Sequence, residues 1–271
     1  MALTPRSSRV VAARRLLRRR HRDEAGLFLA EGPPGVREAL AAGSVVELFT
    51  DGRGGDLVGA ATAAGVPVRL GSEAALAALT ETVTPQGIVA VSRHLHIELS
   101  DMVADRPRLV AVLAGVADPG NAGTVLRTAD AAGADAVVFG RGGVDPYNGK
   151  CVRASAGSLF HVDLVRDVEA TAVVEALRDD GLTVLAADAH GDTDLGQLAR
   201  SGGLAGRTAW IFGSEAHGLP PEVADLATAR VRVPMYGRAE SLNLAAAAAV
   251  CLYASAQALD RGAPRDIDRA V

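Results

Sequence analysis

Short apolar runs in the second half of this sequence are each followed by a polar or glycine-containing turn and then by a helix-like stretch. LVAVLAGV leads into DPGNAGTVLRTAD, TAW leads into IFGSEAHGLP, and VPMYGRAESLN feeds a run of small apolar residues. The apolar runs do not alternate with polar residues, which is typical of parallel strands covered by helices on both faces. We therefore expect a parallel α/β sheet whose turns gather at one edge, where such folds bind ligands.

The pattern from residue 109 onward predicts a series of strands and helices. Strands are expected at 109–114, 136–140, 182–187, 208–212 and 229–233, and helices at 121–133, 168–180, 220–226 and 241–259. Residues 141–161 are expected to form a long polar loop with a short helix. Long ordered loops of this kind usually carry function.

The first part of the chain also alternates strands and helices. After a helix expected at 7–22, strands are expected at 27–30, 45–50, 66–70 and 87–91, and helices at 35–42, 55–65 and 72–79. Residues 92–108 lose this pattern, which indicates a linker. We therefore predict a basic helix plus a small α/β domain over residues 1–96, a linker over 97–108, and a second domain over 109–271.

Charge is distributed unevenly along the chain. Residues 1–22 hold eight arginines and no acidic residue. The rest of the chain holds 20 basic and 32 acidic residues, which gives it a net charge of −12. Such a basic block is typical of phosphate binding, because a guanidinium donates two hydrogen bonds at once to a phosphate. A solvated basic helix or a disordered arm is the alternative interpretation.

Composition narrows the class of protein further. Hydrophobic residues make up 49% of the chain, so we expect a globular fold. The N-terminus lacks the apolar core of a secretory signal and no stretch is a clear membrane span, so we expect a cytoplasmic protein without membrane contact. Cys151 and Cys251 are expected to be inert thiols. His94 and His96 have no third ligand at suitable spacing, so no metal is expected.

Common nucleotide and acyl-transfer motifs are absent. DPGNAGTVLR lacks the glycine spacing of a dinucleotide fold, Lys150 is followed by cysteine and not by the Ser or Thr of a P-loop, and FGSEAHG differs from the Gly-x-Ser-x-Gly turn of hydrolases. The turn before the last helix is more informative. Ser241 and Asn243 are good N-cap residues, and Glu240 adds a carboxylate at the same positive helix end. Three such residues within four positions indicate a site.

In this order, the three turns resemble the signature motifs of the SpoU/TrmH family of RNA ribose 2′-O-methyltransferases, which belongs to the SPOUT superfamily. The matching residues are Asn121-x-Gly123-x-x-x-Arg127, then Phe212-Gly213-Ser-Glu215-x-x-Gly218, then Val233-Pro-Met235 followed by Ser241-Leu242-Asn243. The stretch 145–157 resembles a further family segment. FLAEGPPGVREAL and Gln86-Gly87 resemble the family's RNA-recognition domain, although Pro85 stands where the family often has histidine.

The resemblance implies a fold, a cofactor and partners. The implied fold is a C-terminal parallel-sheet SPOUT domain with a deep trefoil knot, preceded by a small α/β RNA-recognition domain, and the implied assembly is a homodimer. S-adenosylmethionine is the implied methyl donor. The residues implied to hold it are Gly213, Val233, Met235 and Leu242.

The resemblance also implies roles for polar residues. The implied catalytic residues are Arg127, Asn121, Glu215, Ser241 and Asn243, with Arg127 at the centre as a general base or as an electrostatic orienter, since a guanidinium is effectively never deprotonated. Helix capping is the alternative for Asn121, Ser241 and Asn243, and a surface salt bridge with Asp130 is the alternative for Arg127. RNA is expected to contact Arg14, Arg15, Arg18 and Arg19, and Arg153 and Ser155 are expected either to bind RNA phosphate or to reach across to the partner copy.

The function predicted in this way is an S-adenosylmethionine-dependent RNA ribose 2′-O-methyltransferase acting on 23S ribosomal RNA. Ribosomal RNA is preferred because ribosomal members of the family often carry a separate N-terminal recognition domain. The alternatives are a transfer RNA 2′-O-methyltransferase, a non-catalytic knotted protein that binds RNA or assists ribosome assembly, and a small-molecule methyltransferase, which would leave the basic arm unexplained.

Overall fold

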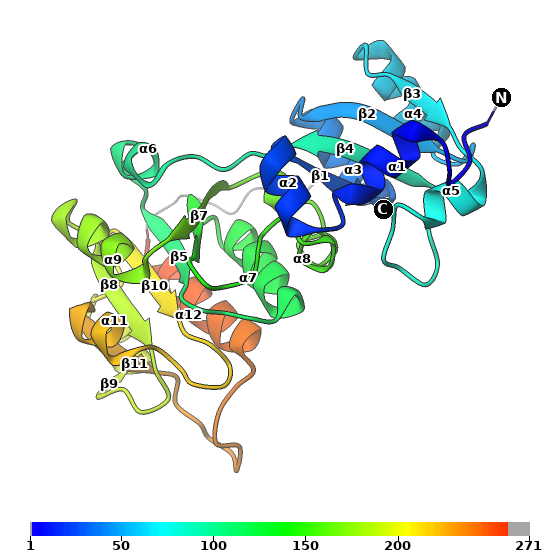
Figure 1. Cartoon of the computed structure of the whole chain (residues 1–271). Coiled ribbons are helices and arrows are strands. Elements are labelled where there is room, and N and C mark those ends of the chain that lie inside the picture. The colour runs from blue at the N-terminus through cyan, green and yellow to red at the C-terminus, as the bar shows by residue number, and fades with distance from the viewer. Residues whose placement is uncertain (1, 260–271) are drawn as a thin grey trace.

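The computed structural model describes residues 2–259 and contains two sheets that lie in separate halves of the molecule (Figure 1). Met1 lies outside the described residues, and so do residues 260–271, which were expected to form the end of the second domain. Within residues 2–259, no helix is both long and apolar enough to cross a membrane.

The first sheet has four strands in the order β1-β4-β2-β3. Its strands are β1 (Leu27–Glu31), β2 (Val45–Thr50), β3 (Val68–Leu70) and β4 (Ile88–Arg93). β4 pairs antiparallel with both β1 and β2, while β2 and β3 run parallel. Two helices cover one face, α3 (Gly32–Ala41) and α4 (Gly55–Ala63), and two cover the other, α1 (Ser8–Arg15) and α5 (Glu73–Ala77).

The second sheet has seven strands, all parallel, in the order β7-β6-β5-β10-β8-β11-β9. Its strands are β5 (Leu109–Leu113), β6 (Ala136–Gly140), β7 (Asp163–Val168), β8 (Thr183–Ala187), β9 (Thr193–Asp194), β10 (Thr208–Phe212) and β11 (Ala229–Arg232). The predicted parallel α/β sheet is therefore confirmed.

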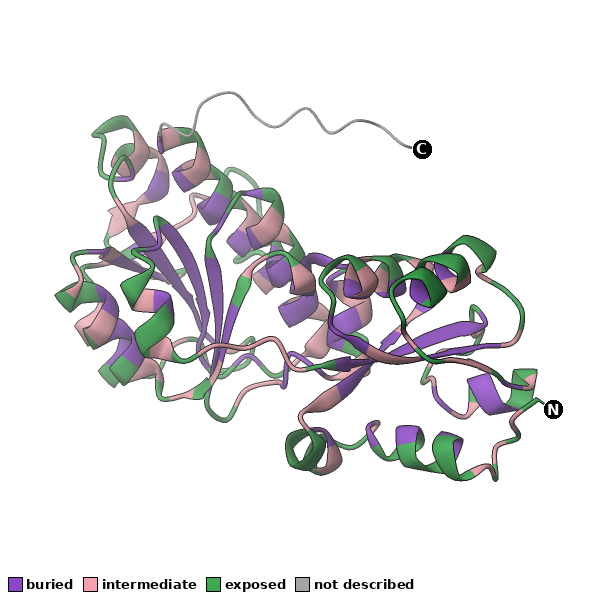
Figure 2. Ribbon diagram, turned by 90° about the horizontal axis from the view of Figure 1, so that it is seen from above, coloured by how far each residue is buried: buried purple, intermediate pink, exposed green. Residues whose placement is uncertain are grey.

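Helices cover both faces of this sheet, so its central strands are buried throughout (Figure 2). Alternate residues of β10 show the two faces: Trp210 packs toward α7 (Pro119–Ala131) and α12 (Leu244–Ala258), and Ile211 packs toward α6 (Leu99–Ala104) and α9 (Ala170–Asp179). The remaining helices are α2 (Arg19–Ala25), α8 (Gly149–Ala154), α10 (Leu195–Arg200), α11 (Pro221–Leu226) and a short 3-10 helix (Ser158–Phe160).

The structure differs from the expected elements at several places. The single helix expected at 7–22 is wrong: α1 and α2 are separated by an extended Arg18 (φ −104°, ψ 130°). The chain breaks there because the carbonyls of Leu16 and Leu17 accept hydrogen bonds from the buried Arg22 guanidinium. Strands β7 and β9 and helix α10 were not expected, and the expected linker 97–108 contains helix α6.

Candidate functional site

The loops that follow β8, β10 and β11 enclose a cavity of about 430 Å³ at the carboxyl edge of the second sheet. Of the residues expected to hold a cofactor, Gly213, Val233, Met235 and Leu242 all line it. Of those expected to be catalytic, Glu215, Ser241 and Asn243 line it as well. The structure therefore brings the second and third turns together around one hollow.

The first turn joins this site through a hydrogen-bond network. The Asn121 side chain donates from Nδ2 to Glu215 Oε1 (2.9 Å) and accepts at Oδ1 from Asn243 Nδ2 (3.2 Å). Asn243 Oδ1 in turn accepts the backbone N–H of Ala245 (2.9 Å) and so caps α12. One asparagine pair therefore links all three turns, and for Asn243 capping and site formation are compatible.

The N-terminus of α7 is held in place by Asp118. Its Oδ1 accepts the backbone N–H of Asn121 (2.8 Å), and its Oδ2 pairs with Lys150 Nζ (2.8 Å). The Lys150 ammonium is the first cause of a lowered Asp118 pKa, and the bond from Asn121 adds to it. Capping therefore falls to Asp118, and the side chain of Asn121 is left for the network with Glu215 and Asn243.

Two glycines of the turns permit close approaches that no other residue allows. A Cβ on Gly213 would lie 2.3 Å from the carbonyl carbon of Gly218, because residues 214–218 fold back over β10. A Cβ on Gly123 would lie 2.5 Å from the backbone oxygen of Cys151, because α7 packs directly on α8. Both glycines are therefore required by packing.

Arg127 lies further along α7, outside the cavity lining. It is exposed, and within residues 2–259 its guanidinium has no ion pair or hydrogen bond. The alternative salt bridge with Asp130 is absent, because Asp130 lies 2.8 Å from His161 Nδ1 instead. The structure therefore leaves Arg127 available to a ligand.

The residues expected to contact RNA divide into two groups. Arg14, Arg15 and Arg18 are exposed, and Arg19 is also exposed but lies within 4 Å of two carboxylates, those of Asp23 (3.6 Å) and Asp167 (3.8 Å).

Arg153 and Ser155 do not fit the expectation. Arg153 forms an ion pair with Glu31 of β1, so it joins the two halves of the molecule. Ser155 is fully buried, and its hydroxyl donates to the Val152 carbonyl (2.8 Å). An exposed RNA contact at Ser155 is therefore wrong for this structure, because the close packing of α8 on α7 encloses it.

Sequence reasoning missed the contribution of the loop after β8. Ala187, Asp188 and Ala189 line the cavity. Burial opposes ionisation of Asp188, but hydrogen bonds from the His190 N–H (2.8 Å) and the Arg230 guanidinium (2.6 Å) outweigh it and lower the Asp188 pKa. The sequence did hold a signal for this loop, since Asp188 directly follows the strand expected at 182–187.

Other candidate chemistries find no support in the described residues. Within residues 2–259, no group of three His, Cys, Asp or Glu side chains is arranged to hold a metal ion. Cys151 and Cys251 are free and buried, and burial raises the pKa of Cys251 to about 12 and that of Cys151 further. Both are therefore inert thiols, as expected.

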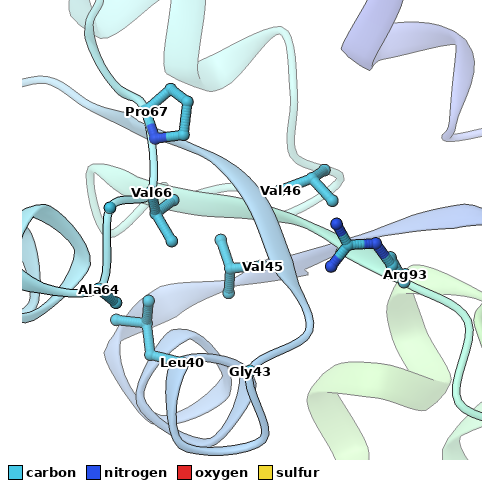
Figure 3. Close-up of a pocket in the computed structure, with 9 residues that line it drawn as sticks. Leu40, Gly43, Val45, Val46, Ala64, Val66, Pro67 and Arg93 are labelled. Atoms are coloured by element: carbon cyan, nitrogen blue, oxygen red, sulfur yellow. The ribbon is translucent and has the colours of Figure 1, made fainter.

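A second hollow, of about 360 Å³, lies in the first half of the molecule (Figure 3). It is lined by Leu40, Gly43, Val45, Val46, Ala64, Gly65, Val66, Pro67 and Arg93. Arg93 is the one charged side chain among these residues, and none of the three turns reaches the hollow. It lacks the polar network of the first cavity and is not the candidate site.

Comparisons with known protein families identify two matching family models. A family model of the SpoU rRNA methylase family matches residues 108–253. A second model, of the MRM3-like substrate binding domain, matches residues 7–90. The first match spans more than half of the chain and contains all three turns.

Individual relatives match along most of their length. The chain is 35% identical to the 23S rRNA (guanosine(2553)-2′-O)-methyltransferase RlmP of Bacillus subtilis, over 89% of this chain and 92% of that protein. A crystal structure of an AdoMet-bound rRNA methyltransferase from Sinorhizobium meliloti superposes with a TM-score of 0.81 at 31% identity, covering 93% of this chain and 95% of that one. The SpoU methyltransferase AviRb of Streptomyces viridochromogenes, in complex with AdoMet, gives 0.81 at 29% identity, covering 93% and 98%.

Proposed function

Because the chain belongs to the SpoU rRNA methylase family, we propose that it transfers a methyl group from S-adenosylmethionine to a ribose 2′-hydroxyl of 23S ribosomal RNA. The observation that carries this proposal is the Asn121–Glu215–Asn243 network, which joins the three turns at the edge of the cavity. The Bacillus subtilis relative, named for this reaction, supports the choice of substrate. Transfer RNA is the alternative substrate.

The cavity suits S-adenosylmethionine in size and chemistry. Its volume of about 430 Å³ is within the range of small-molecule sites. Its walls are largely apolar, with Val233, Met235 and Leu242 available to an adenine ring. When bound, S-adenosylmethionine would supply an electrophilic methyl group on a sulfonium sulfur; the ribose 2′-oxygen would bond to the methyl carbon as the S–C bond breaks, S-adenosylhomocysteine would leave, and the hydroxyl proton would pass to solvent.

In this proposal the protein acts mainly by orientation. Methyl transfer requires in-line approach of the hydroxyl, and correct positioning accounts for a large part of such a barrier. Asn121, Glu215 and Asn243 hold the three turns in one arrangement, and Ser241 at the cavity wall positions the ribose. A single misplaced turn would therefore disturb both cofactor and substrate.

Arg127 is proposed to act through its charge. A guanidinium stays protonated in proteins, so it stabilises a developing alkoxide or orients a phosphate and does not accept the hydroxyl proton. The absence of a side-chain partner within residues 2–259 supports this role, because a cation committed to a carboxylate would be less available to RNA.

RNA is proposed to bind the first half of the molecule. The exposed side chains of Arg14, Arg15 and Arg18 support this proposal, as does the match of residues 7–90 to a substrate binding domain. We propose residues 1–96 as an RNA-recognition domain and residues 109–271 as a SPOUT methyltransferase domain, with Arg19 as a further phosphate contact.

We also propose a knotted second domain and a homodimer. The trefoil knot is what the family resemblance implies, and the family match over residues 108–253 supports it. The exposed Val250 and Tyr253 on the alanine-rich α12 support a helix-packed dimer interface, since apolar side chains there gain from being covered. An enzyme acting on ribosomal RNA is expected in the cytoplasm.

The proposed function is tested by incubating the protein with methyl-labelled S-adenosylmethionine and either ribosomal RNA or transfer RNA. Label in ribosomal RNA alone supports the proposal, and label in transfer RNA alone favours the alternative substrate. Cofactor binding without label in either RNA would point to a ribosome-assembly intermediate as substrate. Neither cofactor binding nor label would favour a non-catalytic RNA-binding protein.

A further inference from the structure

Arg22 is the one arginine of the basic block that is buried, and it occupies the corner between α1 and α2. Its guanidinium donates from Nη1 to the carbonyls of Leu16 (2.9 Å) and Leu17 (3.0 Å), which end α1. Its Nε and Nη2 both donate to Asp145 Oδ2, at 2.9 and 2.7 Å. Both side chains of this ion pair are 4% exposed. Arg22 is therefore unavailable to RNA but fixes the shape of the corner.

Asp145 belongs to the other half of the molecule, so the pair spans the junction. Its second oxygen, Oδ1, accepts the backbone N–H of Tyr147 (3.0 Å) and a bond from Arg166 of β7 (3.4 Å). Arg166 also donates to Asp23 of α2 (2.7 Å). Two ion pairs, Arg22–Asp145 and Asp23–Arg166, thus connect α2 with the second half of the molecule.

The same loop inserts an aromatic ring into the junction. Tyr147 is buried against Phe28, with ring centroids 4.7 Å apart, and stacks in parallel on His94 at 4.1 Å. Its hydroxyl oxygen accepts the backbone N–H groups of Leu95 (2.7 Å) and His96 (2.9 Å). The loop that holds Asp145 is therefore tightly packed, and a residue tied to it has little freedom to move.

This loop also leads to the candidate site. Asn148 follows Tyr147 and caps α8, which packs on α7 at Gly123. The N-terminus of α7 carries Asn121 of the three-turn network. A continuous set of packed elements therefore runs from the α1–α2 corner through Arg22, Asp145, α8 and α7 to the cavity.

We propose that the buried Arg22–Asp145 pair positions the basic corner of Arg14, Arg15 and Arg18 so that RNA bound there presents its ribose at the cavity. This inference rests on the proposed function and assigns Arg22 and Asp145 as positioning residues. The arginine block then has two roles: exposed members bind phosphate, and Arg22 sets where they stand. Guanidinium–phosphate contacts fix register without reading bases, so their placement decides which nucleotide reaches the site.

The test is a charge-neutral double variant, Arg22→Met with Asp145→Leu. Replacing both members leaves no lone buried charge at the pair and does not change the net charge of the protein, while the Tyr147 N–H and Arg166 each lose one acceptor. The carbonyls of Leu16 and Leu17 lose their donor, so the corner is released. We expect the KM for ribosomal RNA to rise by roughly tenfold. We also expect the slope of log affinity against log salt to become shallower by about one unit or more, because phosphate contacts are lost. Saturating kcat and affinity for S-adenosylmethionine stay within twofold of wild type, a range set by ordinary scatter among near-neutral variants.

The matched control is Arg207→Met with Asp180→Leu. Arg207 likewise pairs with an aspartate and donates to two carbonyls, those of Pro107 and Asp180, but lies at the amino edge of the second sheet, before β10. This control variant should leave the KM for ribosomal RNA and the salt dependence of RNA affinity unchanged. Circular dichroism establishes that both double variants are folded at the assay temperature.

Each outcome decides the inference. Unchanged KM and salt slope in a folded Arg22/Asp145 variant would overturn it, and so would an equal loss in the Arg207/Asp180 control, which would reveal a general effect of destabilisation. A fall in kcat alone would place the pair in catalysis instead. If the wild-type protein neither binds nor methylates RNA, the proposed function itself fails, and RNA binding measured by filter retention separates that case from the others.

Discussion

The side chains of Asn121 and Asn243, 122 positions apart in the sequence, share a hydrogen bond of 3.2 Å. Asn121 also binds Glu215, so residues from three separate turns meet at one amide. Each asparagine uses both the nitrogen and the oxygen of its amide. The Asn243 oxygen accepts the backbone N–H of Ala245 and so caps α12. The arrangement of the site therefore depends on this pair.

The first prediction concerns Asn121→Ala, which removes both bonds of this amide. Glu215 and Asn243 then lose a common partner, and the three turns are free to shift. Because small misplacements of reacting groups are costly, we expect methyl transfer under saturating cofactor to fall on the order of 10²-fold. Thr124→Ala, one turn further along α7, is the control, since among the described residues the Thr124 hydroxyl binds only its own helix, at the Gly120 carbonyl. Full activity in Asn121→Ala would contradict this role.

The second prediction concerns Gly213→Ala. The added Cβ would meet the backbone of Gly218 at 2.3 Å, so the loop over β10 must open. Overpacking of this kind costs about 1–3 kcal/mol, so we expect the affinity for S-adenosylmethionine, measured by calorimetry, to fall by roughly 5- to 150-fold. Gly206→Ala, where a Cβ has open space, should bind the cofactor as wild type does. Equal affinity in both variants would show that this loop does not form the cofactor site.

The third prediction concerns stability and compares two helical glycines. Gly123→Ala places a Cβ 2.5 Å from the Cys151 carbonyl oxygen and 2.6 Å from the Ala154 Cβ, which forces α7 away from α8. We expect the free energy of unfolding to fall by about 1–3 kcal/mol. Gly59→Ala in α4 meets no atom within 4 Å and should be neutral or stabilising by up to about 1 kcal/mol. Urea denaturation of both variants measures the difference, and a stable Gly123→Ala protein would refute the close packing.

The fourth prediction concerns pH and follows from His161. Burial opposes protonation of this ring, but Asp130 at 2.8 Å and Glu38 at 3.2 Å outweigh it and raise the His161 pKa. A group whose pKa is raised by folding stabilises the fold fully below its unfolded pKa, about 6.5 for histidine, and loses that contribution as pH rises through the folded value.

His161 links Asp130 of α7 with Glu38 of α3, so its charge bridges the two halves of the molecule. We expect His161→Gln to lower the Tm relative to wild type near pH 5.5, about one unit below the unfolded histidine pKa, and the difference to vanish near pH 9. His190→Gln, whose side chain is exposed and makes no ion pair within residues 2–259, serves as the control. A Tm difference that is constant across this range would contradict the bridge.

The sequence predicted the parallel sheet and the gathering of three turns at its edge because both depend on local patterns, whereas the cofactor role of two of these turns came from the family resemblance. Runs such as 109–113 and 208–212 are continuous apolar segments, and a turn that follows such a strand must lie at the carboxyl edge of the sheet. The pattern therefore places Gly213, Glu215 and Asn243 at the same edge of the sheet.

The errors have a common physical origin in contacts between distant residues. Strand β7 reads DLVRDV, and its polar side chains are tolerated because it lies at the edge of the sheet, with Arg166 paired to Asp23. The break after α1 depends on Arg22, whose partner Asp145 is 123 positions away. Arg153 was expected at RNA but binds Glu31 across the junction. No local pattern encodes such partners.

The central claim is that the protein methylates a ribose oxygen of ribosomal RNA with the help of Arg127. The most direct measurement transfers labelled methyl groups from S-adenosylmethionine to ribosomal RNA and then hydrolyses the product with alkali, which cannot cleave next to a 2′-O-methylated ribose. The account predicts label in alkali-stable dinucleotides with the wild-type protein and its loss with Arg127→Ala, while cofactor affinity is unchanged. Label recovered only in mononucleotides, or full transfer by Arg127→Ala, would contradict it.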